Sequence, residues 1–340
     1  MDTTVLERQH KRLSRLKAQG ITRSTVLVHD DCRPALDSLR PHLVDPSKAA
    51  ALAAFEAQIQ GRRQPVNVAQ VRQLSPFRYP GGKTWLVPEV RAWVQAMPQR
   101  PRLLVEPFAG GAMVGLSAAA ENWVDRVELA EIDADVAAVW YLIFHGSEAE
   151  VAAWTQRIAS FSVAEAEVRA VLEQPPTTLV EMAFRTLIKN RMQRGGIMAA
   201  GAGLIKSGEN GRGLASRWYP ETLVKRITLL RQLVGKLTFY LEDAFVAIAR
   251  HRHDAQALFF VDPPYTAGGK RAGSRLYTHN QVDHERLFAV MAEVAGAVMM
   301  SYDDAPEVRA LAARYGFRVD EVPMKNTHHA IIRELLILKP

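Results

Sequence analysis

Short apolar runs recur along the chain, and longer segments of helical character separate them. The runs have the length and the β-branched or aromatic content of buried strands. They lie at 102–108 (RLLVEPF), 126–133 (RVELAEID), 237–242, 258–261 (LFFV), 297–301, 317–322 and 335–338. Strand–helix alternation of this kind predicts an α/β fold with one doubly wound, Rossmann-like sheet.

The alternation stops between the second and third predicted strands. Residues 147–193 are predicted to be helical throughout, and another helix is expected at 221–234. The glycine-rich stretch 194–220 between them has no steady period, which is typical of a loop. We therefore predict that a mainly helical subdomain, residues 147–235, is inserted into a sheet domain formed by residues 71–146 and 236–340.

Residues 1–70 are predicted to form a helical N-terminal extension. A basic helix is expected near 5–18 and an alanine-rich helix near 47–60, and GRRQP at 61–65 is typical of a linker. The start has no apolar core, so no signal peptide is expected, and no apolar stretch approaches the length that spans a bilayer. The protein is expected to be cytoplasmic.

Composition narrows the class of protein further. Hydrophobic residues make up 48% of the 340 residues and charged residues 23%, which is typical of a globular protein. The only cysteine is Cys32, which excludes an internal disulfide and a cysteine-built zinc site. No metal site is predicted.

The net charge of +7 is concentrated in two segments. Residues 1–73 hold 12 lysines and arginines against 7 acids, and residues 185–231 hold 10 against 2. The rest of the chain is therefore acidic overall. Positive charge concentrated on an acidic body favours a surface that binds a polyanion, although a solvated surface is the alternative.

The run LFFV leads directly into DPPY at 262–265. Pro263 and Pro264 remove two backbone donors, so the strand must end there and leave Asp262 and Tyr265 at the carboxyl edge of the sheet. A carboxylate and the rigidly held Pro263 carbonyl could accept the two N–H bonds of an exocyclic amine on a nucleobase. Tyr265 could stack on that base once it leaves the duplex.

A second pattern lies at VEPFAGGA, residues 105–112. It fails the G-x-G-x-x-G dinucleotide fingerprint because Ala112 occupies a glycine position, and PGGKT at 80–84 lacks the first glycine of a phosphate loop. What remains is a strand, a close glycine turn and an acid, Glu131, that ends the next strand. Such an acid suits the hydroxyl groups of a ribose.

Together these motifs resemble the Dam-like N6-adenine DNA methyltransferases, which use S-adenosylmethionine (SAM). The resemblance covers roughly residues 75–340 and keeps the family's order of RYPGGK, EPFAGGA, AEIDAD, a basic insert, DAF, DPPY and SYDD…ELLIL. It implies a SAM-dependent methyltransferase sheet with an inserted target-recognition subdomain. Ala112 and Glu131 depart from the commoner glycine and aspartate. Both changes are expected to be tolerated, since alanine adds one methyl group and glutamate keeps the charge.

The resemblance also implies site residues. Asp262, Pro263, Pro264 and Tyr265 would act on the target base. Glu131 would hold the SAM ribose, and Asp243 and Ala244 would meet the SAM adenine. The implied cofactor-binding set is Tyr79, Gly82, Lys83, Glu106, Phe108, Gly110, Glu131, Ile132, Asp243, Ala244 and Asp262.

The basic insert coincides with the target-recognition region that the resemblance implies, so double-stranded DNA is the expected partner and the protein is expected to associate with the nucleoid. The candidate DNA-binding residues are Lys189, Arg191, Arg194, Lys206, Asn210, Arg212, Arg217 and Lys225. Lysines and arginines on the flanking helices would contact phosphates, and the glycine-rich loop would read bases. The N-terminal extension is expected to add DNA affinity or to contact a second copy of the chain in a homodimer.

Three alternatives stay open at this point. Cytosine N4 is also an exocyclic amine, although aspartate at the head of the motif favours adenine. RNA is an alternative substrate, although the large basic insert favours duplex DNA. A catalytically silent DNA-binding regulator would need a broken cofactor site, and the sequence shows no such break apart from Ala112.

Overall fold

The protein is described by a computed structural model that covers residues 14–15, 17–19, 33–49, 51–52, 68–78, 82–198, 201–208, 211–264, 281–325 and 331–339. The chain divides into two compact units, Met1–Gln64 and Pro65–Pro340, and the division falls inside the predicted linker. In the first unit, helix α2 (Arg33–Leu39) and the short 3-10 helix η2 (Pro46–Lys48) bury no side chain. The helices predicted near 5–18 and 47–60 lie mostly outside the described residues.

The second unit is built on a seven-stranded sheet of order β3-β2-β1-β4-β5-β7-β6. The strands are β1 (Leu103–Glu106), β2 (Arg126–Glu131), β3 (Leu237–Leu241), β4 (Ala257–Val261), β5 (Ala297–Asp303), β6 (Arg318–Lys325) and β7 (Ile331–Leu338). Strands β1 to β5 pair in parallel, and β7 pairs antiparallel with both β5 and β6. The predicted α/β fold with a doubly wound sheet is confirmed.

Successive residues of the central strands point to opposite faces of the sheet and enter two separate cores. Phe260 packs into the core that includes α4 (Val87–Gln95), α5 (Met113–Ala120) and α6 (Ala134–His145). Its neighbour Phe259 packs into the core that includes α11 (Ala244–His251), α13 (His284–Glu293) and α14 (Pro306–Arg314). A strand covered on both faces needs apolar residues at every position, which is why LFFV shows no alternation.

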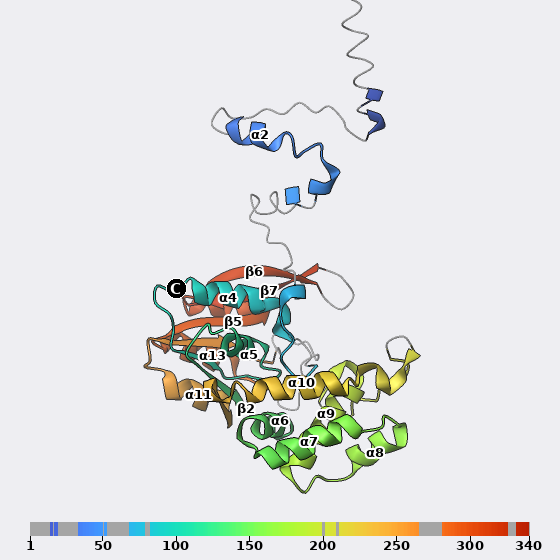
Figure 1. Ribbon diagram of the computed structural model, residues 1–340. Helices are drawn as coiled ribbons and strands as arrows, with labels where there is room; N and C mark the ends of the chain where they lie inside the picture. The colour runs from blue at the N-terminus through green and yellow to red at the C-terminus, as the bar shows by residue number, and fades with distance from the viewer. Residues whose placement is uncertain are drawn as a thin grey trace, which may run out of the picture. The chain divides into compact units, whose positions relative to one another are not determined.

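Among its described residues, the insert has four α-helices, three of which pack against α6 (Figure 1). The helices are α7 (Glu148–Ser160), α8 (Glu165–Glu173), α9 (Leu179–Met192) and α10 (Pro220–Arg231). The prediction of continuous helix over 147–193 was wrong at two breaks. Capping boxes at Ser147 and Thr178 begin α7 and α9, and Pro175 and Pro176 lie in the second break.

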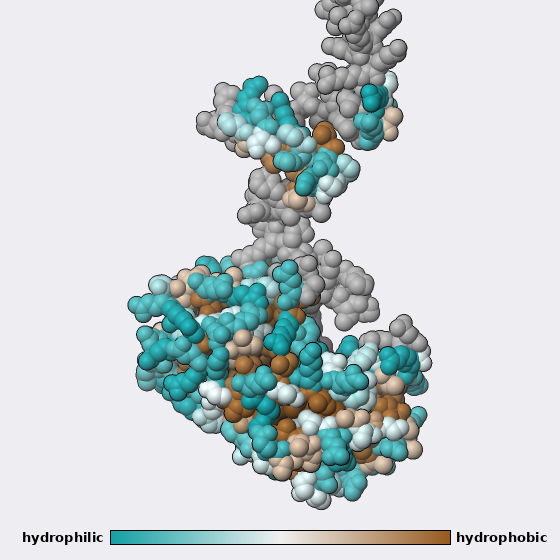
Figure 2. All heavy atoms as spheres, in the orientation of Figure 1, coloured by the Kyte–Doolittle hydropathy of each residue, from teal (hydrophilic) through white to brown (hydrophobic). Residues whose placement is uncertain are grey.

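The insert and the sheet share one hydrophobic core. Trp154 of α7 and Phe184 of α9 are fully buried and belong to the same cluster as the sheet residues Leu129 and Phe239. Figure 2 shows the outside of this unit, where hydrophilic side chains are interspersed with hydrophobic patches that gather across its middle. The insert is therefore fastened to the sheet domain by buried apolar contacts. Among the described residues, no helix is both long enough and apolar enough to cross a membrane.

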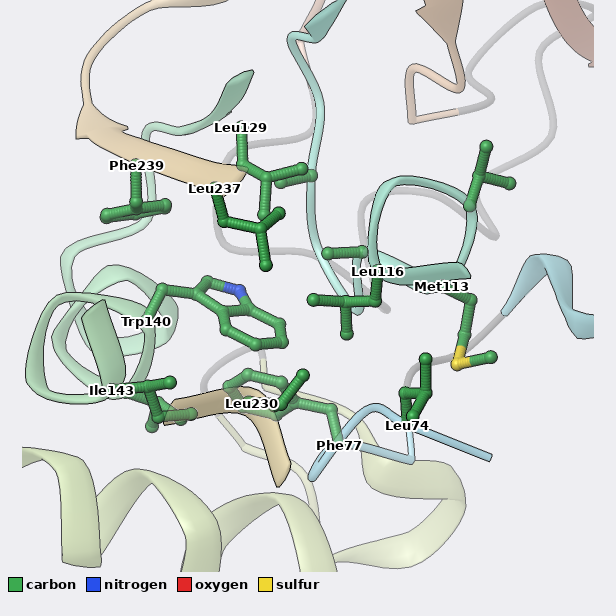
Figure 3. Packing of buried hydrophobic residues seen from close by; sticks show 14 of the residues in the cluster. Leu74, Phe77, Met113, Leu116, Leu129, Trp140, Ile143, Leu230, Leu237 and Phe239 are labelled. Carbon is green, nitrogen blue, oxygen red and sulfur yellow. The ribbon is translucent and has the colours of Figure 1, made fainter. Parts of the chain in front are cut away.

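The core beneath the first glycine turn is centred on Trp140 of α6. Figure 3 shows its indole ring between Phe77, Leu116, Leu237 and the strand residue Leu129. The indole Nε1 donates a hydrogen bond to the Gly110 carbonyl, 2.9 Å away. Packing of α6 thus also fixes the backbone of the turn.

Candidate active site

The strand order reverses between β1 and β4. From β1 the chain continues outward to β2 and β3, whereas β4 and β5 lie on the other side. In an open α/β sheet, the crevice outside the carboxyl ends of strands at such a point binds ligands. The turn after β1 and the DPPY segment after β4 both lie at this edge, so the fold brings together the two motifs that the sequence singled out.

Asp262 is held by two side chains from different segments. Its Oδ1 atom accepts a hydrogen bond from Ser301 Oγ at 2.7 Å and lies 3.0 Å from Lys83 Nζ. Ser301 is in β5, and Lys83 begins the short helix η4 (Lys83–Leu86). The Asp262 side chain is 22% exposed, whereas Lys83 is 6% exposed. The carboxylate therefore has a fixed orientation and an open side toward solvent.

Two further acidic groups lie around Lys83 and Asp262. Glu334 Oε2 of β7 is 3.8 Å from Lys83 Nζ, and Glu334 is buried. Glu106, at the end of β1, accepts a hydrogen bond from the Gly115 backbone N–H of α5 at 2.7 Å. Burial raises the pKa of Glu106 to about 8, the Gly115 N–H opposes this rise, and the charge of Asp262 adds to it. Burial therefore favours the protonated form of Glu106.

Glu131 ends β2 and accepts three backbone N–H bonds. Its Oε2 atom accepts from Gly110 at 2.8 Å, and its Oε1 atom accepts from Ile132 and Asp133 at 2.9 Å each. Burial raises the pKa of Glu131 to about 7, although these N–H bonds act in the opposite direction. Glu131 thus joins the end of β2 to the glycine turn.

The glycine turn has left-handed backbone at two positions, Gly110 with φ of 46° and Ala112 with φ of 50°. Ala112 precedes the first residue of α5 and gives the helix no side-chain cap. The expected effect of alanine here was one added methyl group. The left-handed backbone at Ala112 adds an energetic cost, because this conformation is less favourable for an L-residue than for glycine by about 1 kcal/mol.

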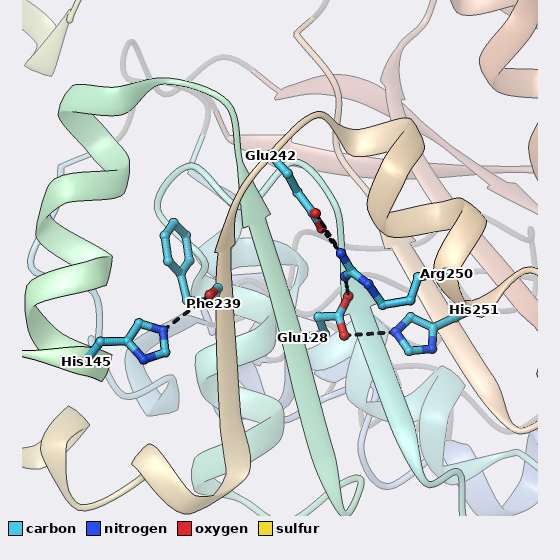
Figure 4. Close-up of polar contacts among 6 residues, drawn as sticks. All are labelled: Glu128, His145, Phe239, Glu242, Arg250 and His251. Carbon is cyan, nitrogen blue, oxygen red and sulfur yellow. Dashed lines mark hydrogen bonds and ion pairs between the residues drawn. The ribbon is translucent and has the colours of Figure 1, made fainter.

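The turn after β3 presents Asp243 and Ala244 at the start of α11. Asp243 caps this helix by accepting the Phe245 N–H at 2.8 Å, and Ala244 is buried. Arg250 of α11 ties the helix to the sheet, because it bonds Glu128 of β2 and lies 2.6 Å from Glu242 Oε2 (Figure 4). These ion pairs fasten the last turn of α11 to the middle of β2. The Glu242 backbone N–H donates to the Glu131 carbonyl at 3.1 Å, which places the turn before α11 beside the end of β2.

The remaining implied cofactor residues fall at the same edge or outside the described residues. Ile132 is 42% exposed immediately after Glu131, Phe108 is partly buried, and Gly82 precedes η4. Pro263 and Pro264 follow Asp262 directly. Tyr79 and Tyr265 lie outside the described residues. Sequence reasoning missed Ser301 and Glu334. Their positions inside SYDD and ELLIL were the available signal, but most residues of each strand are apolar.

The candidate DNA-binding residues separate into outward-facing and inward-facing groups. Arg194, Lys206, Arg212 and Lys225 are exposed, and Arg217 is partly buried. A groove between α8 and residues 203–206 and 212–215 is lined by Arg194, Lys206 and Arg212, and by Arg169, which pairs with Glu165 in the same lining. The loop prediction for 194–220 missed an antiparallel bridge between Gln193 and Leu204 at the base of this segment. Asn210 lies outside the described residues.

Two members of the predicted set face inward. Arg191 is 4% exposed, and its Nη2 atom donates to the Pro76 carbonyl. Burial lowers the pKa of Arg191 to about 9, and the neighbouring Arg226, Arg78 and Arg217 act in the same direction. Arg191, a predicted DNA contact, is buried in this structure, and its side chain joins α9 to the segment before η4. Lys189 is committed to Asp135 of α6, with 3.0 Å between Nζ and Oδ2.

The edge of the sheet therefore brings together an oriented carboxylate, a glycine turn and a strand-end acid. Among the described residues, no cluster of three histidine, cysteine or acidic side chains could hold a metal ion.

A family model described as D12 class N6 adenine-specific DNA methyltransferase matches residues 79–325. No curated protein matches the sequence. Among solved structures, the rRNA methyltransferase aviRa from Streptomyces viridochromogenes has a TM-score of 0.37 and 12% identity, covering 81% of this chain and 94% of its own. The precorrin-6y C5,15-methyltransferase from Geobacter metallireducens has a TM-score of 0.32 and 9% identity, covering 74% and 86%.

Proposed function

Because the chain belongs to the D12 class of N6 adenine-specific DNA methyltransferases, we propose that it methylates an adenine flipped out of duplex DNA, with SAM as methyl donor. The observation that carries this proposal is the position of Asp262. Its carboxylate lies at the point where the strand order reverses, fixed by Ser301 and Lys83 beside the glycine turn.

The residues at the edge fit SAM by the chemistry of their side chains. A sulfonium group is cationic, and this edge carries Asp262, Glu131 and Asp243. Glu131 would accept from the ribose hydroxyl groups, and Ile132 would lie against the adenine ring. Left-handed Gly110 lets the backbone approach the ligand closely without a side chain in the way. SAM would supply the electrophilic methyl group.

Asp262 and Pro263 would act on the target amine. The N6 nitrogen of adenine is a poor nucleophile because its lone pair is delocalised into the ring. If the Asp262 carboxylate and the Pro263 carbonyl accept its two N–H bonds, electron density on nitrogen rises as the N–C bond to the methyl group forms. As this bond forms, the methyl–sulfur bond of the donor would break and leave a neutral thioether. Asp262 would stabilise the positive charge that develops on the nitrogen, and the nitrogen would then release one proton through the Asp262 carboxylate to solvent. Tyr265 would hold the flipped base by stacking.

The insert would hold the duplex. Its exposed cations Arg194, Lys206, Arg212 and Lys225 supply positive charge on the same unit as the site. Phosphate contacts by such side chains give affinity, and contacts to base edges give the choice of sequence.

The function is tested by incubating the full chain with duplex DNA and methyl-labelled SAM, and then digesting the DNA to nucleosides for mass spectrometry. The expected product is N6-methyladenine. Labelled N4-methylcytosine would reassign the base, and label in RNA alone would reassign the substrate. DNA binding without any methyl transfer would identify a silent regulator.

A further inference from the structure

Glu334 is a buried carboxylate in β7, where it lies between the exposed Arg333 and a run of apolar residues. It occupies the middle of β7, and Leu335, Leu336 and Ile337 after it are all buried. Burying an ionised carboxylate without a partner is strongly unfavourable, so a glutamate persists here only if something compensates its charge. The group that compensates the charge of Glu334 therefore indicates what Glu334 does.

The partner that lies nearest to the active site is Lys83. Its Nζ atom is 3.8 Å from Glu334 Oε2 and 3.0 Å from Asp262 Oδ1. Both Lys83 and Glu334 side chains are less than a tenth exposed, so water screens this interaction weakly. One buried ammonium group thus lies between a carboxylate of the antiparallel strand β7 and the carboxylate that follows β4.

We propose that Glu334 is a positioning residue for methyl transfer, which acts by fixing Lys83 and, through it, the carboxylate of Asp262. A lysine side chain has a flexible four-carbon stem, and a single ion pair leaves its ammonium group several positions. The second anionic contact, from Glu334 of β7, restricts the Lys83 ammonium group to one of these positions. Lys83 and Ser301 then act on the same oxygen of Asp262, which defines the plane of the carboxylate.

This inference rests on the proposed function, because it requires Asp262 to act on the amine. Its energetic basis is orientation. Reacting groups need near-attack geometry, and a displacement of about 1 Å costs on the order of 100-fold in rate. Glu334 touches neither substrate in this scheme, so its removal should slow the chemical step and leave ligand affinity nearly unchanged.

The test is Glu334→Gln, which keeps the shape of the side chain and removes its charge. We expect the single-turnover rate at saturating SAM and DNA to fall by roughly 10- to 100-fold. The Kd values for SAM and for duplex DNA should change by less than about threefold. Glu334→Asp, which keeps the charge on a shorter stem, should recover part of the rate. It also provides a readout if the glutamine variant does not fold.

A double-mutant cycle distinguishes this role from general destabilisation. If Glu334 acts through Lys83, Glu334→Gln should slow Lys83→Gln by less than about twofold further. The matched control is Glu321→Gln on the neighbouring strand β6, where the exposed Glu321 pairs with Arg309 and Arg333. This control should leave the rate unchanged.

The inference is overturned if Glu334→Gln transfers methyl groups at the normal rate. It is also overturned if the two rate losses multiply in the double variant, or if SAM affinity falls while saturated turnover stays normal. Failure of the proposed function would look different, because the wild-type chain itself would then leave no N6-methyladenine in DNA.

Discussion

The carboxyl edge of the sheet and the inserted subdomain are both rich in charge, but they use it differently. At the edge, Glu131 and Asp262 lie where strands end, and the backbone of the sheet dictates their positions. In the insert, charge is carried by long side chains on helices and loops, which can turn outward or inward. Arg191 and Arg226 turn inward and donate to the carbonyls of Pro76 and Ser75.

This difference shows that a high density of lysine and arginine in a sequence does not by itself give the number of cations available to a ligand. A guanidinium group can bind a phosphate, but it can also satisfy a carbonyl that would otherwise be buried without a donor. Arg185 does this with the Leu172 carbonyl between α9 and α8. The +8 balance of residues 185–231 therefore includes arginines that hold the insert together as well as cations available to DNA.

The largest effect is expected at the edge. Asp262→Ala should lower the rate of methyl transfer by roughly 100-fold or more, since the carboxylate acts on the attacking amine. SAM and DNA affinity should be largely retained. Single-turnover transfer and separate binding titrations check this, and a near-normal rate would remove Asp262 from the site.

Arg191 provides the matching test of the inward-facing arginines. Arg191→Ala should lower the free energy of unfolding by about 2 kcal/mol or more, because it leaves a cavity and a buried Pro76 carbonyl without its donor. The exposed Arg194 is the control, and its alanine variant should stay within about 0.5 kcal/mol of wild type. Equal free energies of unfolding for the two variants in urea denaturation would show that the buried Arg191 stabilises the fold no more than the exposed Arg194 does.

The same contrast decides what could be predicted from sequence. The strand–helix alternation predicted the sheet, and the proline stop after LFFV predicted the place of Asp262, because strand geometry leaves few choices. The direction of a lysine or arginine on a helix depends on neighbours that are distant in sequence, as with Lys189 and Asp135. Ser301 and Glu334 were missed for a related reason, since pairing with the site depends on strand order.

Glu131 gives the edge a pH dependence of known sign. Burial raises the pKa of Glu131 from 4.5 to about 7, so the folded, unliganded protein binds this proton more tightly than the unfolded chain does. The free energy of unfolding should therefore fall as pH rises from 4.5 to about 7. Affinity for SAM should move in the opposite direction, because the ionised carboxylate is the better acceptor for ribose hydroxyl groups. Below pH 7 the Kd should rise by up to about tenfold per pH unit.

Calorimetry of SAM binding between pH 5.5 and 8.5 checks this dependence, with Glu131→Gln as the matched variant. The variant should bind SAM more weakly at high pH and show a flatter profile. If the wild-type profile is flat as well, Glu131 does not hold the ribose.

Among the outward-facing cations, Arg212 is expected to read sequence. It lies in the groove-lining segment, and its guanidinium group is 5.8 Å from the centroid of the Tyr219 ring. Arg212→Ala should reduce discrimination at particular base pairs by about 1–3 kcal/mol. Arg217 is the second candidate reader, with the same expected range. Cognate and single-mismatch duplexes measured at one salt concentration test both variants. A uniform loss across all duplexes would show that this loop does not read bases.

Lys225 should give the smallest effect and the opposite signature. It is exposed on α10, a regular helix, so its ammonium group can meet a phosphate but has no fixed fork of donors with which to distinguish bases. Lys225→Ala should therefore weaken all duplexes alike and reduce the slope of log affinity against log salt by about one. Titrations of cognate and unrelated duplexes over a range of salt concentrations measure both quantities. A loss confined to the cognate duplex would make Lys225 a reader, and the division between positioning helices and a reading loop would then have to be redrawn.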